Sequence, residues 1–276
     1  AFQRNFGLRY SYADIIFFPD DDSLWYPDYA ENVLRVYDID SSEKIGGVQG
    51  KSVKSPPPGV FQINSRPHSV SLKDKVSSHL VTINKILNFN IFEDPLFIEG
   101  QSRHRLLPMP ENITNDIAIP SAPMTGFAMS FRSNMIKKYR FDENLGPYSL
   151  FEDRDASLNV MGEKMVFAAL KAKVYHYRVP SPRSSGKEWG VMHILNRAYV
   201  VCKHSTPVSK SRKALKTYLL YKIFRYLLQT TNSYGFLRLY GSIKAYSQVN
   251  RLLKAIKEEL PSAYLTAKKE CLKTVH

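Results

Sequence analysis

Two hydrophobic periods alternate along the first two thirds of the chain, one typical of strands and the other of helices. The run 14-DIIFF-18 has the length and composition of a β-strand, and Pro19 closes it. Residues 27–38 open with a proline and keep their apolar positions near one face, which predicts a helix. The same criteria predict further strands at 44–53, 127–132 and the end of 166–178, and further helices at 74–89, 133–139 and 155–165. Because strands alternate with helices, we expect an α/β fold with a mostly parallel sheet flanked by helices.

The last third of the chain predicts helices only, at 190–204, 214–230 and 237–260. In the last of these, apolar residues recur at steps of three and four and form one continuous stripe: Leu239, Ile243, Tyr246, Val249, Leu253, Ile256 and Leu260. Such a stripe either packs on the rest of the protein or lies in a membrane interface. No uncharged apolar run approaches the roughly 18 residues of a membrane span.

Charge divides the chain in a similar place. The net charge is +14, and residues 191–276 hold 16 Lys and Arg against 3 Asp and Glu. Residues 1–190 are nearly neutral, so we predict a globular body over 1–190 and a basic, amphipathic helical region over 191–276. A cationic region of this kind indicates an anionic partner, either membrane lipid or nucleic acid. No nucleic-acid recognition motif is present, which favours an anionic membrane surface and leaves no nucleic acid expected. The two cysteines provide no disulfide framework, as expected in a reducing compartment.

Two acidic clusters are candidates for chemistry. The first, Asp20-Asp21-Asp22, directly follows the predicted strand at 14–18. Neighbouring carboxylates there can share a divalent cation with a phosphorylated ligand, although acidic triplets are also common in solvated turns. The second cluster, residues 152–155, lies in a loop predicted over 141–155 and starts a helix. It can be a favourable charge pairing with the helix N-terminus, or it can supply a general base.

His176 is a third candidate, near the end of a predicted strand. A lone histidine is more often packed or at the surface, but a neutral imidazole beside Asp22 would complete a divalent metal site. The sequence contains no Gly-rich phosphate loop, nucleophile elbow, HExxH or CxxC motif. The options for an enzyme therefore narrow to carboxylate and metal chemistry.

The order of these pieces resembles the family 2 glycosyltransferases with the GT-A fold. RNFG at 4–7 is similar to the family's Arg-Asn-x-Gly helix, and IIFFPDDDSLWYPDYAENVL to its metal strand, Asp-x-Asp motif and following helix. The run from TGFAMSF to VYHYR, residues 125–178, is similar to the acceptor-side Gly, the Glu-Asp motif and the terminal strand with its His. NRAYVVCKHSTP is similar to a helix that follows the catalytic body in bacterial members. The resemblance covers residues 1–50 and 120–206.

The resemblance implies an inverting, metal-dependent transfer of a sugar from a nucleotide-diphosphate sugar to an acceptor hydroxyl. Asp153 would be the catalytic base, with Glu152 beside it. The remaining roles would be divided among metal binding by Asp22, Asp20 and His176, donor binding by Asp20, Asp21 and Arg4, and acceptor binding by Gly126, Glu152 and Trp25. The cofactor would be Mg²⁺ or Mn²⁺, and the acceptor a glycan or a lipid-linked glycan. These properties imply bacterial surface polysaccharide or glycolipid synthesis at the inner, cytoplasmic face of the membrane, with peripheral attachment.

The chain departs from the family pattern in two places. Family members begin with a βαβ unit that holds the nucleotide base, whereas Arg4 already belongs after that unit, so we expect an N-terminally incomplete GT-A-like domain. Residues 54–120 match no part of the pattern. A catalytically inactive fragment, or a basic protein that binds nucleic acid or membrane, is therefore the alternative hypothesis.

Overall fold

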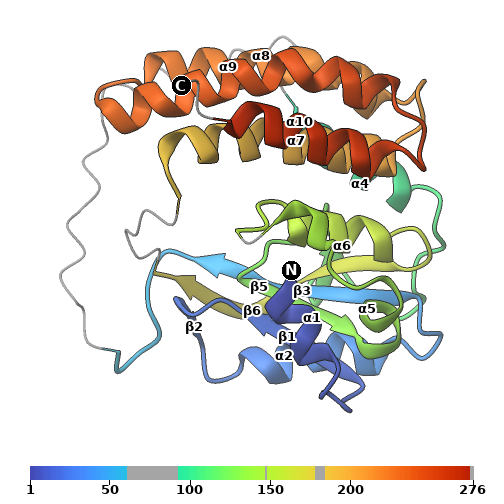
Figure 1. Cartoon of the computed structure of the whole chain (residues 1–276). Coiled ribbons are helices and arrows are strands. Elements are labelled where there is room, and N and C mark those ends of the chain that lie inside the picture. Colours follow the sequence, from blue (N-terminus) through green and yellow to red (C-terminus); the bar gives the residue numbers. More distant parts are fainter. Residues whose placement is uncertain (61–92, 147, 178–183, 274–276) are drawn as a thin grey trace, which may run out of the picture. The chain divides into compact units, whose positions relative to one another are not determined.

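The computed structural model describes residues 1–60, 93–146, 148–177 and 184–273. The chain divides into two compact units, one formed by residues 1–62 with 99–181 and the other by 63–98 with 182–276 (Figure 1). The predicted helix at 74–89 lies outside the described residues.

A six-stranded sheet forms the centre of the first unit (Figure 1). Its strands are β1 (Ile15–Pro19), β2 (Ser23–Trp25), β3 (Ile45–Val53), β4 (Ala118–Pro120), β5 (Ala128–Arg132) and β6 (Met165–His176). They follow the order β1-β5-β3-β6-β2, and β4 also pairs with β6. The strands at the two ends of this order, β1 and β2, follow one another directly in the chain. The two ends of the sheet therefore come close together, and the sheet is barrel-like and nearly closed.

The prediction of a mostly parallel, GT-A-like sheet is wrong. Only β3 and β6 run parallel, while the pairs β1–β5, β3–β5, β2–β6 and β4–β6 are antiparallel. The error has a physical reason: hydrophobic periodicity reports which positions are buried, not the direction in which a strand enters a sheet. Strand β1 pairs with β5, which lies more than a hundred residues later and is not reached by a βαβ crossover. The fold is therefore α/β with a mixed, mostly antiparallel sheet and a C-terminal helical region.

Helix α2 (Tyr29–Ile39) supplies much of the core of this unit and confirms the helix predicted at 27–38. Its apolar face, with Tyr29, Val33 and Val36, is buried in one cluster with residues of β3 and β6. The Tyr29 hydroxyl donates to the Ala128 carbonyl at 2.9 Å. A side chain at Gly50 would place its Cβ 2.2 Å from the Tyr29 ring, so only glycine fits there. This packing fixes β3 and β6 beneath α2.

The other helices of this unit bring the candidate residues into place. They are α1 (Phe2–Leu8), α5 (Ser133–Tyr139) and α6 (Glu152–Val160), and α4 (Pro95–His104) spans the boundary between the units. Helix α5 confirms the prediction at 133–139. The loop predicted over 141–155 is wrong at its end, because α6 begins at Glu152 and the acidic cluster is its first turn. Carboxylates are favoured there by the partial positive charge of the helix N-terminus.

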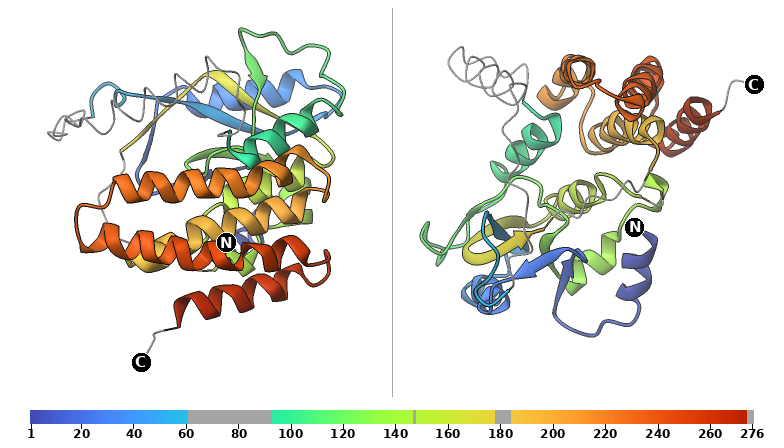
Figure 2. Two further views of the ribbon diagram at one scale, coloured as in Figure 1. Left: turned by 90° about the horizontal axis from the view of Figure 1, so that it is seen from above. Right: turned by 90° about the vertical axis from the view of Figure 1, so that its left-hand side faces the viewer.

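Four helices form the described part of the second unit outside α4, and they lie side by side (Figure 2). They are α7 (Gly186–His204), α8 (Lys210–Leu228), α9 (Ser233–Lys254) and α10 (Leu260–Leu272). Ser185, Ser209 and Asn232 cap the first three through their side chains. A Cβ at Gly190 would fall 2.2 Å from the Arg238 carbonyl oxygen, and one at Gly241 2.3 Å from that of Lys187. Glycine at these positions therefore lets the backbones of α7 and α9 approach closely.

The helix predicted over 237–260 is two helices, since α9 ends at Lys254 and α10 begins at Leu260. Of the seven residues of the predicted apolar stripe, three are buried (Leu239, Val249 and Leu260), two are half-buried (Tyr246 and Leu253) and two are exposed (Ile243 and Ile256). The stripe is therefore only partly used for packing within the protein.

A cationic cluster lies inside the helical unit. Arg197 is only 4% exposed and forms an ion pair with Asp94 at 3.1 Å. The ammonium of Lys222 lies 5.1 Å from the centre of the Tyr218 ring. Within the described residues, no carboxylate forms an ion pair with Lys222. Burial, together with the positive charges of Arg197 and Arg225, lowers the pKa of Lys222 to about 8.

Replacing Lys222 by methionine should stabilise the protein at neutral pH. The lysine binds a proton less readily when folded than when unfolded, so its buried charge opposes folding below pH 8, and this penalty fades as the pH rises towards 10. We expect Lys222→Met to raise the free energy of unfolding by about 1–3 kcal/mol at pH 7, with a smaller gain at pH 10. Urea unfolding at both pH values measures this. Lys216→Met on the exposed side of α8 is the matched control, and an equal gain from that variant would refute the explanation.

Candidate metal centre

Three predicted metal ligands lie together at one end of the sheet. Asp20 and Asp22 belong to the short turn that joins β1 to β2, and His176 is the last residue of β6. The β2–β6 ladder places His176 opposite Ser23, the residue after Asp22. The Tyr177 amide donates to the Asp22 carbonyl at 2.9 Å and extends this pairing. Residues separated by more than 150 positions are thus brought together by regular strand pairing.

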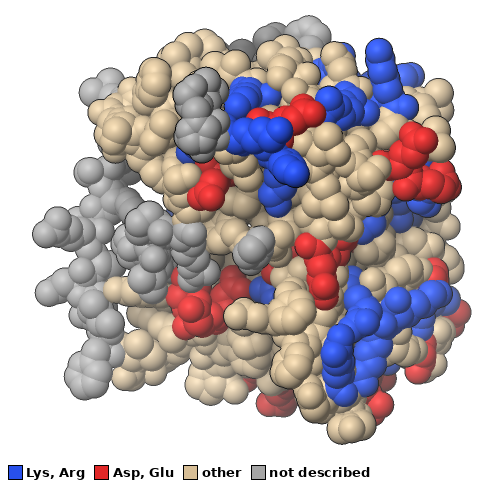
Figure 3. Space-filling view, in the orientation of Figure 1, with Lys and Arg blue, Asp and Glu red and all other residues tan. Residues whose placement is uncertain are grey.

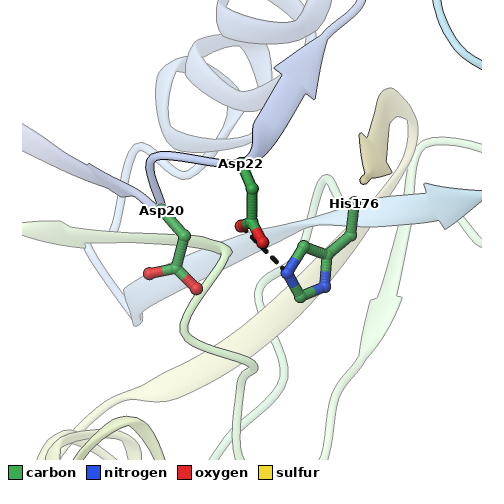
Figure 4. A group of neighbouring side chains, drawn as sticks. All are labelled: Asp20, Asp22 and His176. Atoms are coloured by element: carbon green, nitrogen blue, oxygen red, sulfur yellow. Dashed lines mark ion pairs between the residues drawn. The ribbon is translucent and has the colours of Figure 1, made fainter. Parts of the chain in front are cut away.

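The side chains of these three residues converge (Figure 4). One ligand atom from each of Asp20, Asp22 and His176 lies within 4.8 Å of the other two. His176 Nε2 lies 3.1 Å from Asp22 Oδ1. The imidazole stacks on the Phe127 ring at a centroid distance of 4.5 Å, and its Nδ1 is buried with no hydrogen-bond partner in the described structure. Stacking therefore holds the ring with Nε2 directed at the carboxylates.

Arg4 joins this group to the second acidic cluster. Its guanidinium is 2.9 Å from Asp20 Oδ1 through one nitrogen and 2.8 Å from Glu152 Oε1 through the other. Asn5 fixes the helix that bears Arg4, because its side-chain amide exchanges two 2.8 Å hydrogen bonds with the backbone of Phe141. The two carboxylate clusters, more than 120 residues apart in the chain, therefore face one another through a single arginine.

Asp153 lies beside this arginine in the first turn of α6. Its Oδ2 accepts a hydrogen bond from the Gly126 amide at 2.9 Å, and its Oδ1 accepts one from the Arg154 amide at 2.8 Å. A Cβ at Gly126 would meet Arg4 and Asp153 at 3.6 Å each, so Gly126 is in van der Waals range of both. The backbone thus orients the carboxylate of Asp153 beside Gly126, and Gly126 in turn lies beside Arg4.

Electrostatics report the same proximity. Burial raises the pKa of Asp20, Arg4 opposes that rise, and the negative charges of Asp22 and Asp153 add to it. Arg4 pairs with Asp20 and Glu152, and the Arg154 guanidinium lies 3.9 Å from Asp153. A bound divalent cation would further reduce the mutual repulsion of the carboxylates.

The other two predicted site residues lie elsewhere. Asp21 is exposed and is not a member of the converging group. Trp25 stacks on Tyr29 at 4.3 Å and lies 5.4 Å from Phe17, so its indole belongs to the apolar packing of the first unit. Contact of Trp25 with an acceptor stays a prediction.

Sequence reasoning missed the residues that hold the loop bearing Gly126. Gln49 accepts from the Thr125 amide at 3.0 Å and donates to the Ser121 hydroxyl. Ser157 accepts from the Met124 amide at 3.0 Å and donates to the Asp153 carbonyl at 2.7 Å. A glutamine in a strand and a serine in a helix carry no signal that could have identified them. Phe127, which supports His176, was visible only as one of several aromatic residues.

Comparison with known proteins adds no assignment, since no protein-family model matches the chain and no curated protein matches its sequence. Among the helices in the described part of the chain, none combines the length and apolar content required to cross a bilayer.

Proposed function

We propose that the protein is a metal-dependent glycosyltransferase, similar to family 2, that moves a sugar from a nucleotide-diphosphate sugar to an acceptor hydroxyl with inversion. The observation that carries the proposal is the arrangement around Arg4. Arg4 pairs with Asp20, a candidate metal ligand, and with Glu152, the residue before the candidate base Asp153. The mostly antiparallel sheet offers no support from parallel strand ends, so the proposal rests on these side chains and on the sequence resemblance.

The three ligands fit a divalent cation of the proposed kind. Two carboxylates and one imidazole supply ligand atoms within 4.8 Å of one another, a spacing that one ion can bridge. Carboxylate oxygens suit both Mg²⁺ and Mn²⁺, and the imidazole of His176 favours Mn²⁺ between them. When bound, the ion would supply positive charge against the charge that develops on the diphosphate leaving group. Arg4, and the exposed Asp21 at the edge of the turn, would contact the donor.

Asp153 is better placed than Glu152 to act as the general base. Glu152 pairs with the Arg4 guanidinium at 2.8 Å, whereas Asp153 is held by two backbone amides and lies 3.9 Å from the Arg154 guanidinium. A carboxylate accepts about four hydrogen bonds, so these two leave lone pairs for an acceptor hydroxyl. Taking the proton from that hydroxyl as it attacks would be the role of Asp153, with Glu152 and Gly126 contacting the acceptor. An attack from this side, away from the diphosphate, would invert the anomeric carbon.

The helical unit supports a proposal about location. We infer that it attaches the protein peripherally to an anionic membrane surface at the cytoplasmic face, where a glycan or lipid-linked acceptor of bacterial surface-polysaccharide or glycolipid synthesis would be presented. Residues 191–257 contain 13 Lys and Arg and no Asp or Glu. This charge would attract anionic lipid headgroups.

The proposal predicts that Mn²⁺ and a diphosphate bind together. In an electron paramagnetic resonance titration of the full chain, Mn²⁺ should bind, and inorganic pyrophosphate or a nucleoside diphosphate should strengthen its affinity about tenfold or more, because the anion adds ligands to the same ion. A titration of Mn²⁺ with pyrophosphate in the absence of protein is the control, because pyrophosphate itself chelates Mn²⁺. Pyrophosphate tests the metal site without requiring contacts to a base. Mn²⁺ that binds equally with and without diphosphate would contradict the proposed function.

A further inference from the structure

Helices α8 and α9 each expose a row of large apolar side chains on either side of the turn between them. The rows have identical spacing, with steps of four and then three residues, so each follows one face of its helix. We call these six residues the hairpin face: Leu220, Phe224, Leu227, Phe236, Tyr240 and Ile243. They are between 42% and 63% exposed.

The hairpin face is separate from the apolar faces that hold the helices together. On α8 the inward side includes Leu215 and Leu219, and on α9 it includes Ala245 and Val249, all of which are buried. Both helices are thus apolar on two sides, which explains why residues 214–230 show no clear amphipathic direction in the sequence. Only Ile243 belongs to the stripe noted in the sequence. Two exposed apolar rows on consecutive helices indicate a binding surface rather than ordinary packing.

Lysine side chains lie on the same two helix faces, farther from the turn. Lys213 and Lys216 precede Leu220 by seven and four residues on α8, and Lys254 follows Ile243 by eleven on α9, so each lies in line with its apolar row. All three are exposed. Groups of Lys and Arg side chains are visible over the C-terminal helices at the top of Figure 3. The two helices are antiparallel neighbours, so the apolar residues lie near the turn and the cations towards the opposite ends.

We propose that the hairpin face docks on an anionic lipid surface, with its apolar side chains in the boundary between headgroups and acyl chains and Lys213, Lys216 and Lys254 among the headgroups. Apolar and aromatic side chains bordered by lysine are typical of helices that lie in this boundary. A second copy of the chain is a poorer occupant, because pairing two such faces would bring like charges together without an acidic residue between 191 and 257 to compensate. The inference deepens the location given under the proposed function, but it does not depend on sugar transfer.

Vesicle sedimentation with the full chain tests the contribution of the apolar residues of the hairpin face. Vesicles of phosphatidylcholine alone are compared with vesicles containing about 30% phosphatidylglycerol, since anionic lipid should increase binding strongly. Phe224→Ser combined with Phe236→Ser should lower the partition coefficient on anionic vesicles about 30-fold or more. The matched control is Val208→Ser combined with Leu265→Ser, which changes two exposed apolar residues of the same unit outside the hairpin face. Thermal unfolding of both variants checks that the fold is retained, as expected for exposed positions.

A second vesicle-binding experiment tests the contribution of the lysine charges. Lys213→Gln combined with Lys216→Gln should lower binding to anionic vesicles about 10- to 30-fold and leave the weak binding to phosphatidylcholine unchanged. Equal binding of the wild type to both vesicles, or full binding by the Phe224/Phe236 variant, would overturn the proposal. A dimer in analytical ultracentrifugation that this variant abolishes, without vesicle binding by the wild type, would assign the face to a second copy and also overturn it.

Mn²⁺ binding separates this inference from the proposed function. The Phe224/Phe236 variant should bind Mn²⁺ with unchanged affinity, because neither residue belongs to the metal centre. Vesicle binding without Mn²⁺ binding in the wild type would contradict the transferase proposal alone and support the docking face.

Discussion

Replacing Asp22 by asparagine should abolish both Mn²⁺ binding and sugar transfer. Asp22 is the more buried of the two candidate carboxylate ligands, with a side chain that is 10% exposed. Its Oδ1 lies 3.1 Å from His176 Nε2. Asparagine preserves the size of the side chain but removes its negative charge, and a neutral amide is a poor substitute for a ligand carboxylate. We expect the affinity for Mn²⁺ to fall by about 100-fold or more, and turnover by about 1,000-fold if the ion acts on the leaving group.

Asp21→Asn is the matched control for this experiment. It removes the same charge from the adjacent residue, but Asp21 is exposed and is not part of the converging group. Mn²⁺ affinity should change less than threefold, which is the scale of a long-range charge effect screened by solvent. Equal losses in both variants would show that the turn attracts cations through its net charge alone, and the assignment of Asp22 as a ligand would then be wrong.

The sequence predicted the site better than it predicted the sheet. The order of the motifs indicated that Asp20, Asp22 and His176 lie together, and they do so because β2 pairs with β6. Neither β2 nor β4 was predicted. The other four strands and most helices followed from periodicity, which depends only on neighbouring residues. The direction of the strands did not, because β1 pairs with β5 through contacts that no local pattern records.

Other features depended on tertiary contacts in the same way. Trp25 of β2 stacks on Tyr29, the first residue of α2, and the sequence pattern does not record this contact between two elements. The link through Arg4 could not be read from the sequence either, since it requires Asn5 to fix α1 against Phe141. The predicted apolar stripe over 239–260 is divided between α9 and α10, and part of it packs within the helical unit. The surface left exposed is the hairpin face, which shares only Ile243 with the stripe.

Asp153→Asn should remove turnover while leaving Mn²⁺ and donor binding nearly unchanged. The asparagine oxygen can still accept the hydrogen bond from the Gly126 amide, so the loop and α6 should keep their positions. What is lost is a group that can take a proton. Loss of a general base lowers turnover by about 100- to 10,000-fold, and we expect the upper half of that range because the neighbouring carboxylate, Glu152, is engaged by Arg4.

Glu152→Gln distinguishes the base from its neighbour. This variant removes an equal charge one residue away and weakens the ion pair with Arg4. We expect it to raise the KM for the acceptor about tenfold and to lower kcat by less, as for an interaction made in both the ground state and the transition state. Because the two substitutions change the local charge equally, a difference in kcat between them isolates proton transfer. Wild-type turnover in Asp153→Asn, with a large loss in Glu152→Gln, would transfer the role of base to Glu152.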